Sequence, residues 1–589
     1  MRRFLSVRAA LVRVGIQLCC VGGAMAQEVV PPVDGREVLT KERPATNGSD
    51  WTMPYQGAVT FGVGVRTKAQ KSTLKPGGGN NSDDGDLNYL PGDTFSRVVK
   101  ANGRVDIKYR AVTGIVLSGM AWYDDSLARH PVPHGNNPND YLANQPLSDS
   151  GFAREARFSG VSLLDSYVYG SGQVLKGSFS LRLGRLTLPH EAQGFSFPGG
   201  LRDLDARNTA AATRPGALSG EELIPFWGMT ARWTVFPELR LDGFVQFAQQ
   251  KNVGAGCGTF FGTNDYTPDG CNRVFFLKTI TERENVVAGT FIPRAADATP
   301  ANRPDQVGLS SSYLLRELGT RFGISFAHYH SRSSYTSSIK GAKLGPAPGF
   351  GYEIEYPGNK NMLSFTTATK VPSQRISWLN EISVTNAQPL QLNPSSLLAA
   401  FLRGQGPLAA DAIALPANSL YHGYDRFRVI QAQTGVLKEF GSMLGAAKSY
   451  LAAEIGIKHV VGLPDSTLRP YSRPEVDDVC ATDAQCATQD GFVTSNAWGY
   501  RVRAGMEFAN IGGTGITLRP TAAFAQDVKG WSYDYAFVEG RKTVRLTLDG
   551  DFGRNLFANL TYAASRGGLF NTRKDMDFVL ASVGIRFAT

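Results

Sequence analysis

The chain has 589 residues, a mean hydropathy of −0.18, and 61 Lys and Arg against 51 Asp and Glu. No run of about 18 apolar residues occurs, which argues against a transmembrane helix. The basic excess is modest, and it shrinks further once four arginines near the N-terminus are set aside, so the charge does not suggest a nucleic-acid partner.

The first residues have the features of a secretory signal peptide. Four arginines, at positions 2, 3, 8 and 13, flank or precede a short apolar stretch at 14–21, and Ala24-Met25-Ala26 follows. We therefore expect residues 1–26 to be cleaved off as a signal peptide, residues 27–57 to form a periplasmic N-terminal segment, and residues 58–589 to form the folded domain. An anchored N-terminus is the less favoured alternative.

Alternating apolar and polar residues recur along the rest of the chain. Val59, Phe61 and Val63 alternate with small or polar residues, and Val105 and Ile107 alternate with charged ones. This period of two is that of a β-strand with one apolar face. About eighteen such segments of roughly ten residues can be placed. They start near Ala58, Arg97, Ile115, Val161, Gly177, Phe226, Leu239, Gln306, Thr320, Asn361, Gln374, Arg428, Ser449, Trp498, Thr514, Arg541, Asn555 and Asp577.

The links between these segments alternate between long and short. The long ones include residues 67–96, 189–225, 251–305, 386–427 and 462–497. A closed barrel with both termini in the periplasm gives this rhythm, because every second link is a tight periplasmic turn. We predict an all-β fold, a closed antiparallel transmembrane β-barrel of 16 to 18 strands with short periplasmic turns and long extracellular loops. A soluble sandwich shows the same alternation but gives no reason for the rhythm.

The cysteines outside the signal peptide form two local pairs, Cys257 with Cys271 and Cys480 with Cys486. In an oxidising compartment each pair predicts a disulfide that closes a loop, and the spacing does not suggest a metal site. Asp83, Asp84 and Asp86 could hold Ca²⁺, but they lack the twelve-residue ligand pattern, and a solvated acidic turn is favoured. We expect no metal and no cofactor.

Charged residues on the alternating strands are expected to line the lumen. An arginine or lysine facing lipid would cost about 2–4 kcal/mol at the membrane midplane. The expected lumen and selectivity residues are Arg104, Asp106, Lys108, Arg110, Arg182, Arg232, Arg240, Asp242, Arg501, Arg503, Glu507, Arg519 and Arg545, with Glu381, Asp549 and Asp551 on the same reasoning. The lumen is therefore predicted to be wet and rich in cations.

Two of the long links have features of their own. Residues 196–220 suit an inward constriction loop, whose charged residues are Arg202, Asp203, Asp205, Arg207 and Arg214. Residues 394–403 suit a short amphipathic helix, which would cover the pore or, as we favour, pack on the rim.

The order of several stretches along nearly the whole mature chain resembles the proteobacterial outer-membrane β-barrel family of unknown function DUF1302. Among them are Asp84-Gly85-Asp86-Leu87-Asn88-Tyr89, Leu164-Asp165-Ser166-Tyr167-Val168-Tyr169, Cys257-Gly258-Thr259-Phe260-Phe261 and Phe537-Val538-Glu539-Gly540-Arg541-Lys542. Leu188-Pro189-His190-Glu191 departs from the Asn-Trp-Gly-Glu stretch typical of the family. The resemblance implies an outer-membrane barrel concerned with uptake or export of hydrophobic or aromatic compounds.

Motifs of nucleophilic, metal-dependent or nucleotide-dependent enzymes are missing from the sequence. His328, His330 and Ser331 near the end of one segment leave a barrel hydrolase as a weak alternative. Adjacent residues of a strand point to opposite faces, so His330 and Ser331 are not expected to pair. We expect that the chain is not an enzyme.

The sequence therefore predicts a porin-like outer-membrane channel that passes small or hydrophobic and aromatic solutes, with a weak anion preference. The alternative is a non-conducting outer-membrane receptor, or a partner component of a periplasmic or inner-membrane transporter for hydrophobic cargo. Outer-membrane lipid and a small-molecule solute are the expected partners, a transporter is an optional one, and nucleic acid is not expected.

Overall fold

The computed structural model describes residues 50–70, 81–110, 112–188, 196–277, 279–295, 305–473 and 490–588. The predicted signal peptide and the predicted Cys480–Cys486 disulfide lie outside these residues. Within them, no helix is long and apolar enough to cross a membrane.

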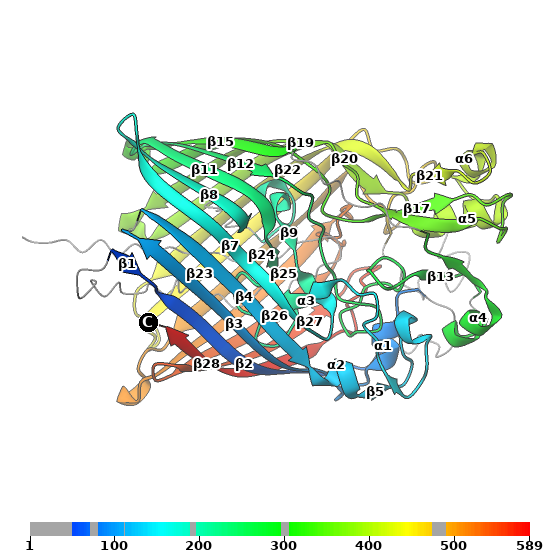
Figure 1. The fold of residues 1–589 in the computed structure, drawn as a ribbon, viewed down its shortest axis with the longest axis horizontal. Coiled ribbons are helices and arrows are strands. Elements are labelled where there is room, and N and C mark those ends of the chain that lie inside the picture. The colour runs from blue at the N-terminus through cyan, green and yellow to red at the C-terminus, as the bar shows by residue number, and fades with distance from the viewer. Residues whose placement is uncertain are drawn as a thin grey trace, which may run out of the picture.

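The main feature of the fold is one large antiparallel sheet that curls into a barrel (Figure 1). Apart from the two-residue strand β1 (Trp51–Thr52), which pairs with β3, the described part of this sheet has eighteen strands. They are β2 (Tyr55–Arg66), β3 (Thr94–Tyr109), β4 (Thr113–Asp124), β7 (Ser159–Val174), β8 (Gly177–Leu186), β11 (Phe226–Phe236), β12 (Leu239–Gln246), β15 (Gln306–Leu315), β16 (Thr320–Tyr329), β19 (Lys360–Val371), β20 (Ile376–Gln391), β22 (Tyr424–Phe440), β23 (Lys448–Val461), β24 (Asn496–Glu507), β25 (Ile516–Lys529), β26 (Lys542–Phe552), β27 (Leu556–Arg566) and β28 (Phe578–Ala588).

The barrel closes between its first and last strands. Val59 of β2 pairs with Ala101 of β3 on one side and with Ile585 of β28 on the other. Every backbone amide in the wall can thus find a partner, which is what allows strands to cross hydrocarbon. The predicted closed antiparallel barrel is confirmed, with eighteen strands, the upper end of the predicted range, and each predicted segment begins within a few residues of the observed strand.

Alternation along each strand separates the two faces of the wall. On β2, Val59 and Phe61 are each 47% exposed on the outside, whereas Thr60 between them is 1% exposed. On β28, Val583, Ile585 and Phe587 are exposed and Leu580 is buried. An apolar exterior on a closed barrel is the surface that lipid requires, and it places the chain in the bacterial outer membrane.

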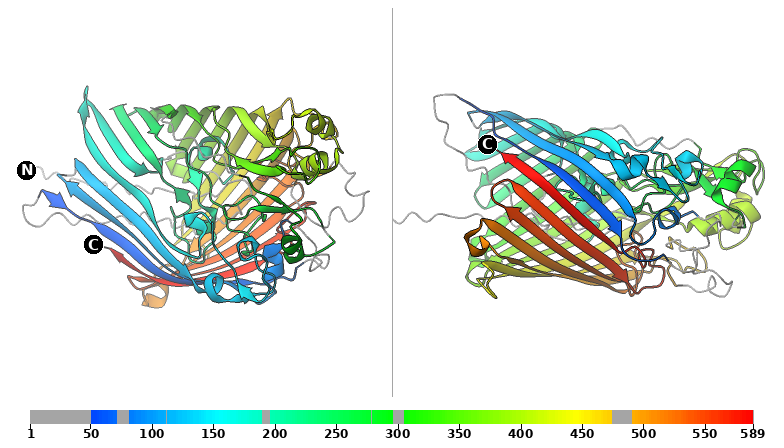
Figure 2. Two further views of the ribbon diagram at one scale, coloured as in Figure 1. Left: turned by 45° about the vertical axis from the view of Figure 1, so that its right-hand side comes forward. Right: turned by 90° about the horizontal axis from the view of Figure 1, so that it is seen from below.

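Long loops gather at one end of the barrel, and both the C-terminus and β1 lie at the other end (Figures 1 and 2). The short turns at this second end include residues 237–238 and 553–555. The long loops are therefore extracellular and the short turns periplasmic, as the rhythm of the links predicted.

The extracellular loops contain short elements of their own. They are α1 (Asp84–Asn88), α2 (Asp125–Arg129), β5 (Pro131–Val132), β6 (Gln145–Pro146), β9 (Ala206–Arg207), α3 (Thr209–Ala212), β10 (Leu223–Ile224), β13 (Arg273–Phe275), α4 (Glu282–Ala288), β14 (Phe291–Pro293), β17 (Tyr335–Ile339), β18 (Gly351–Glu355), α5 (Pro394–Arg403), α6 (Ala409–Ala414) and β21 (Leu420–Tyr421), with 3₁₀ turns at Asn137–Asn139, Arg154–Ala156 and Gly200–Leu204 and, in the periplasmic turns, at Arg316–Leu318, Pro372–Gln374 and Ile511–Gly513.

The predicted amphipathic helix is α5. Asn393 accepts a hydrogen bond from the amide of Ser396 and begins it, and Gly404 ends it in a left-handed conformation. Leu397 and Phe401 are buried in an apolar cluster with β18 and α6. The helix thus packs within the loop layer at the barrel rim (Figure 1), as the favoured alternative held.

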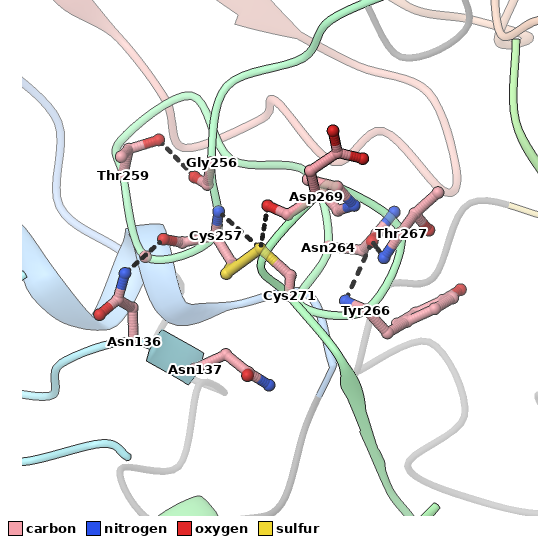
Figure 3. The surroundings of a disulfide bond; sticks show 12 residues. Asn136, Asn137, Gly256, Cys257, Thr259, Asn264, Tyr266, Thr267, Asp269 and Cys271 are labelled. Atoms are coloured by element: carbon pink, nitrogen blue, oxygen red, sulfur yellow. Dashed lines mark hydrogen bonds between the residues drawn. A yellow bond between two sulfur atoms is a disulfide. The ribbon is translucent and has the colours of Figure 1, made fainter. Parts of the chain in front are cut away.

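The predicted disulfide between Cys257 and Cys271 is formed, with Cα atoms 6.2 Å apart. It closes the loop that follows β12. Figure 3 shows Asn136, from a different loop, donating to the carbonyl of Cys257 at 3.2 Å. The bridge therefore lies where two extracellular loops meet.

Candidate solute pathway through the barrel

Residues 196–225, here called the inward segment, run through the interior of the barrel. The segment contains a 3₁₀ turn, β9, α3 and β10, and Figure 1 shows β9 and α3 between the walls. It contacts β2, β3 and β28 on one side and β20, β22 and β23 on the opposite side of the closed strand order. The segment therefore crosses the lumen.

Buried carboxylates hold the beginning of the inward segment to β20 and β23. The amide and hydroxyl of Ser196 donate to Glu454 Oε2 at 2.8 and 2.5 Å. The amide of Leu201 donates to Glu381 Oε1 at 2.9 Å. A carboxylate that accepts several hydrogen bonds in a site shielded from water makes a strong attachment.

Close packing at this attachment requires glycine. Gly199 and Gly200 have φ values of +96° and +60°, and a Cβ on either would lie 2.1 Å from a side-chain oxygen, of Gln431 and Glu381 respectively. Only glycine adopts this backbone while lying so close to the wall.

An ion pair holds the end of the inward segment to β3. Lys100 Nζ lies 2.5 Å from Glu221 Oε2, and Asn102 Nδ2 donates to Glu221 Oε1 at 3.1 Å. Gly216 lies directly against Thr60 of β2 and Ser582 of β28. The segment is thus attached at both ends to opposite walls.

Apolar packing fills the space between the inward segment and the wall formed by β4 to β19. Leu201 and Leu204 of the segment share a buried cluster with Leu188 and with side chains of five strands. Those side chains are Val116, Tyr167, Phe226, Tyr329 and Met362. These apolar contacts hold this part of the inward segment against that wall.

Arginines line the space on the other side, along β25 to β28. A cavity of about 50 Å³ lies there between residues 212–219 of the segment and the wall. Its charged lining residues are Arg214, Arg519, Arg545, Asp549, Asp551 and Arg586. Arg503, Ala523 and Arg545 share one row across β24, β25 and β26, so a small side chain separates two arginines.

A larger cavity of about 250 Å³ lies among the extracellular loops. Aromatic side chains line it, including Phe260, Phe261, Tyr266, Tyr356, Tyr533, Tyr535 and Phe570. Lys251, Arg473, Arg541 and Arg573 line it as well. We call this cavity the mouth of the barrel. Its aromatic rings can pack against an aromatic or apolar group of a solute, while its cationic side chains bind a negative charge.

Residues 7–587 match the model of a family described as a protein of unknown function (DUF1302). The chain belongs to the DUF1302 family. This confirms the resemblance found in the sequence.

No curated protein matches this DUF1302 chain. Solved structures that resemble it include Acinetobacter baumannii OccAB3, with 12% identity, 91% of this chain and 99% of that chain covered, and a TM-score of 0.41. Pseudomonas aeruginosa OccK9 (OpdG) has 10% identity, 91% and 98% coverage and a TM-score of 0.41. Pseudomonas aeruginosa OpdK with vanillate has 10% identity, 91% and 99% coverage and a TM-score of 0.38. Similarity at this level does not show what the DUF1302 chain transports.

On the arginine-lined side of the DUF1302 barrel, several expected lumen residues are ion-paired. Arg519 lies 2.9 Å from Glu507 and 2.6 Å from Asp551, which in turn lies 2.8 Å from Arg586. Arg501 lies over the ring of Phe197 in the inward segment, at 4.5 Å, so it points into the lumen. Arg586 is a residue that sequence reasoning missed, although alternation on the last strand could have found it.

The expected charges on β3, β8, β11 and β12 form a second group. Arg232 and Arg240 pair with Asp242 at 2.5 and 2.9 Å. Arg104 lies 3.8 Å from Asp165, and Lys108 lies 3.7 Å from Asp106. Arg182 lies 5.3 Å from the ring of Tyr167. The pairs on β11 and β12 lie across the barrel from the arginine-lined cavity, whereas β3 is separated from β28 only by β2.

Arg110 does not lie in the lumen, so this part of the prediction was wrong. It lies beyond the end of β3 in the periplasmic turn, with φ of 49°, and pairs with Asp50 at 2.7 Å. Its side chain is 61% exposed. The alternation predicted it in the lumen because the pattern continues one residue past the strand.

The charged residues of the constriction mostly bind within the protein. Arg202 and Arg207 donate to the carbonyls of Phe197 and Arg202 at 3.4 Å, and Asp203 lies 3.6 Å from Lys360. The amide of Leu188 donates to Asp205 at 3.3 Å. Four of them, Arg202, Asp203, Asp205 and Arg207, line a cavity of about 40 Å³.

Arg214 is the exception, since it borders the arginine-lined cavity. It donates to the carbonyl of Glu155 at 2.5 Å and lies 4.1 Å from the ring of Trp122. Burial lowers the pKa of Arg214 to about 10, which Glu221 and Asp124 oppose, so it stays cationic at neutral pH.

His330 and Ser331 are bound separately. His330 Nε2 lies 3.1 Å from Asp305 Oδ1, and its Nδ1 accepts from the amide of Asn359 at 3.2 Å. The Ser331 hydroxyl donates to the carbonyl of Ser333 at 3.0 Å. No hydrogen bond among the described residues joins His330 to Ser331, so the geometry offers no support for a hydrolase.

Proposed function

We propose that this DUF1302 barrel is a gated outer-membrane channel for small organic anions that carry an aromatic or other apolar part. The observation that carries the proposal is the group of arginines beside the inward segment. Apolar side chains pack the segment against one part of the wall, and the space on the side of β24 to β28 is lined by Arg503, Arg519, Arg545 and Arg586.

The charges that line this pathway make it favour anions. Low-dielectric walls focus the field of the arginines into the narrow space, which attracts anions and repels cations. Glu507, Asp549 and Asp551 pair with or lie beside the arginines and weaken the field without reversing it. A preference for anions, but not exclusion of all cations, follows.

The mouth supports the apolar part of the solute. Its cavity combines aromatic rings with Lys251, Arg473, Arg541 and Arg573, and a volume of about 250 Å³ suits a small solute. A ring carrying a carboxylate fits both kinds of lining.

Gating follows from the size of the space beside the inward segment. Cavities of about 50 and 40 Å³ hold no more than a few water molecules. An organic solute larger than these cavities would need the segment to move, and its two polar attachments are the contacts that would have to break.

The test is flux into liposomes that contain the purified chain. We expect benzoate to enter faster than benzylamine, which has a similar size and opposite charge. Arg503→Gln with Arg545→Gln should reduce this ratio several-fold, because both substitutions remove charge from the pathway. Arg129→Gln, which changes the exposed last residue of α2, is the matched control and should leave the ratio unchanged. Equal flux of the two solutes would contradict the proposal.

The narrowness beside the segment favours one alternative, a non-conducting receptor or partner component that passes hydrophobic cargo to a periplasmic or inner-membrane transporter. Such a protein would bind benzoate without releasing it inside the liposome. Stable solute flux by the chain alone would exclude it.

A further inference from the structure

Cationic side chains gather on the outside of the barrel wall, at the extracellular ends of six strands, β22 to β27. These strands follow one another in the wall (Figure 1), and at about 4.8 Å per strand they span roughly 24 Å. Five exposed residues at these ends, here called the basic rim, are Arg426 and Arg428 of β22, Lys529 of β25, Lys542 of β26 and Arg566 of β27.

The register of β24 and β25 places Lys529 on the outer face of the wall. Ala497 of β24 shares a buried cluster with Phe197 of the inward segment and so faces the lumen. Adjacent residues of a strand face opposite sides, so Trp498 faces outward. Lys529 lies directly opposite Trp498 on the neighbouring strand, and such pairs share a face. Lys529 therefore points away from the lumen.

Arg428 and Lys542 face the same way. Arg428 is exposed, whereas Val429 beside it is 3% exposed. Lys542 lies two residues before Val544, which is 39% exposed on the outer face, and Arg545 next to it lines the lumen cavity. Residues two apart on a strand share a face, so Lys542 faces outward as Val544 does.

The basic rim lies at the level of the lipid headgroups. The outer face next to it is apolar, since Ile457 of β23 and Val544 of β26 are exposed there. Lys542 lies two residues beyond Val544, which is about 7 Å along a strand. Trp498 and Tyr500 face outward at this height, as interfacial aromatic residues do. A long cationic side chain here can lay its stem on apolar surface and reach the headgroups.

The basic rim is confined to one side of the barrel. On β11 to β19, the outward residues at or next to the extracellular strand ends are Trp227, Phe247, Val307, His328 and Asn361. None of these is a lysine or an arginine. A general attraction to the membrane surface would place cations all around the wall, so the one-sided set indicates a local binding site.

Two carboxylates lie close to the basic rim and reduce its charge without cancelling it. Asp577 accepts from Arg566 at 2.6 and 2.5 Å, so these two charges balance each other. Glu539, in the loop between β25 and β26, accepts from the amide of Gly530 at 2.8 Å and lies near Lys529 in the chain fold. The other four cations therefore leave a net positive charge on the rim.

The contacts of these four cations leave their charge available. Lys529 and Lys542 make no hydrogen bond or ion pair with any residue that the structure describes. Arg428 donates to the amide oxygen of Asn386 at 2.8 Å, and Arg426 donates to the carbonyl of Gly358 at 2.7 Å. Both acceptors are neutral, so neither contact neutralises an arginine.

We propose that the basic rim binds the phosphate of a membrane-lipid headgroup, held chiefly by Lys529 and Lys542. The two lysines come from neighbouring strands, and an ammonium group binds phosphate as a point charge. Their outward position between the apolar belt and water favours a lipid over a free anion as the source of the phosphate.

A lipid bound here would also contact the base of an extracellular loop. Lys529 and Lys542 flank residues 530–541, and four residues of this loop, Tyr533, Tyr535, Val538 and Arg541, line the mouth. The lipid site lies outside the lumen and is separate from the solute pathway, but it holds the two ends of a loop that shapes the entrance.

Native mass spectrometry of the detergent-purified full chain tests the site, with phosphatidic acid and phosphatidylcholine of the same acyl chains as probes. We expect the wild type to retain phosphatidic acid in preference to phosphatidylcholine. Lys529→Gln with Lys542→Gln should weaken the binding of phosphatidic acid about tenfold, because two interfacial charges are lost. Lys370→Gln with Lys448→Gln removes two exposed lysines from the periplasmic end and is the matched control, which should bind as the wild type does.

Heat-modifiable gel migration checks that each double variant keeps its barrel, so that weaker binding is not a loss of fold. Equal retention of the two lipids by the wild type would overturn the site. Binding of phosphatidic acid by Lys529→Gln with Lys542→Gln at the level of the wild type, or an equal loss in the periplasmic control, would overturn its assignment to the basic rim. Displacement of the lipid by inorganic phosphate at the same concentration would overturn the assignment to a lipid.

Discussion

Lys100 and Glu221 form a buried pair whose side chains are 5% and 3% exposed. We expect Lys100→Met to release the end of the inward segment, because an uncompensated buried charge costs roughly 3–5 kcal/mol. Larger solutes should then pass, as measured by swelling of liposomes in sugars of graded size.

The double variant Lys100→Met with Glu221→Gln is the control for this prediction. It leaves no buried charge without a partner, so the largest sugar that enters the liposomes should be close in size to that of the wild type. An unchanged limit in Lys100→Met would show that the pair does not hold the segment.

The two glycines at the other attachment give a second prediction at this scale. Gly200→Ala places a Cβ against Glu381 and should displace the segment, whereas Gly220→Ala has a similar positive φ but no atom within 4 Å. Each substitution costs about 1–2 kcal/mol because alanine is strained at a positive φ. Only the clash with Glu381 therefore distinguishes the two variants. In single-channel recordings, Gly200→Ala should show a larger and noisier conductance than Gly220→Ala. Indistinguishable recordings of the two variants would argue against close packing of Gly200 on Glu381.

The sequence predicted the positions of some individual residues correctly and of others incorrectly. Alternation identified Arg503, Arg519 and Arg545 because a period of two assigns each strand residue to one face. It could not find the partner of Lys100, which lies 121 positions away in a loop. It also placed Arg110 in the lumen, because a pattern does not show where a strand ends.

The inward segment is the element on which the pathway depends. Replacing residues 198–220 with a short Gly-Ser linker should leave the barrel closed, since its walls pair only with one another. Conductance should rise several-fold and the size limit should increase, because the lumen of an eighteen-stranded barrel is wide without a plug. Heat-modifiable migration checks the barrel, and unaltered conductance would place the constriction elsewhere.

Elements were predicted well where local pattern determines them. The eighteen strands, α5 and the inward direction of residues 196–220 all follow from alternation, helical spacing and loop length. The mouth cavity was not predicted, because its aromatic and cationic residues come from several loops and share no local pattern.

At the scale of the whole molecule, closure, sidedness and charge act together. The closed wall satisfies the backbone and turns apolar residues toward lipid, which leaves charged residues no place but the lumen. The inward segment then crosses that lumen and packs through apolar side chains against part of the wall. Beside it lies an arginine-lined space, with an aromatic and cationic mouth among the extracellular loops.

Single-channel recording in a planar bilayer under a KCl gradient tests this account most directly. We expect discrete open steps and a reversal potential displaced toward that of Cl⁻, with a smaller displacement in Arg503→Gln with Arg545→Gln. The absence of open steps, or a reversal potential displaced toward that of K⁺, would contradict an arginine-lined channel.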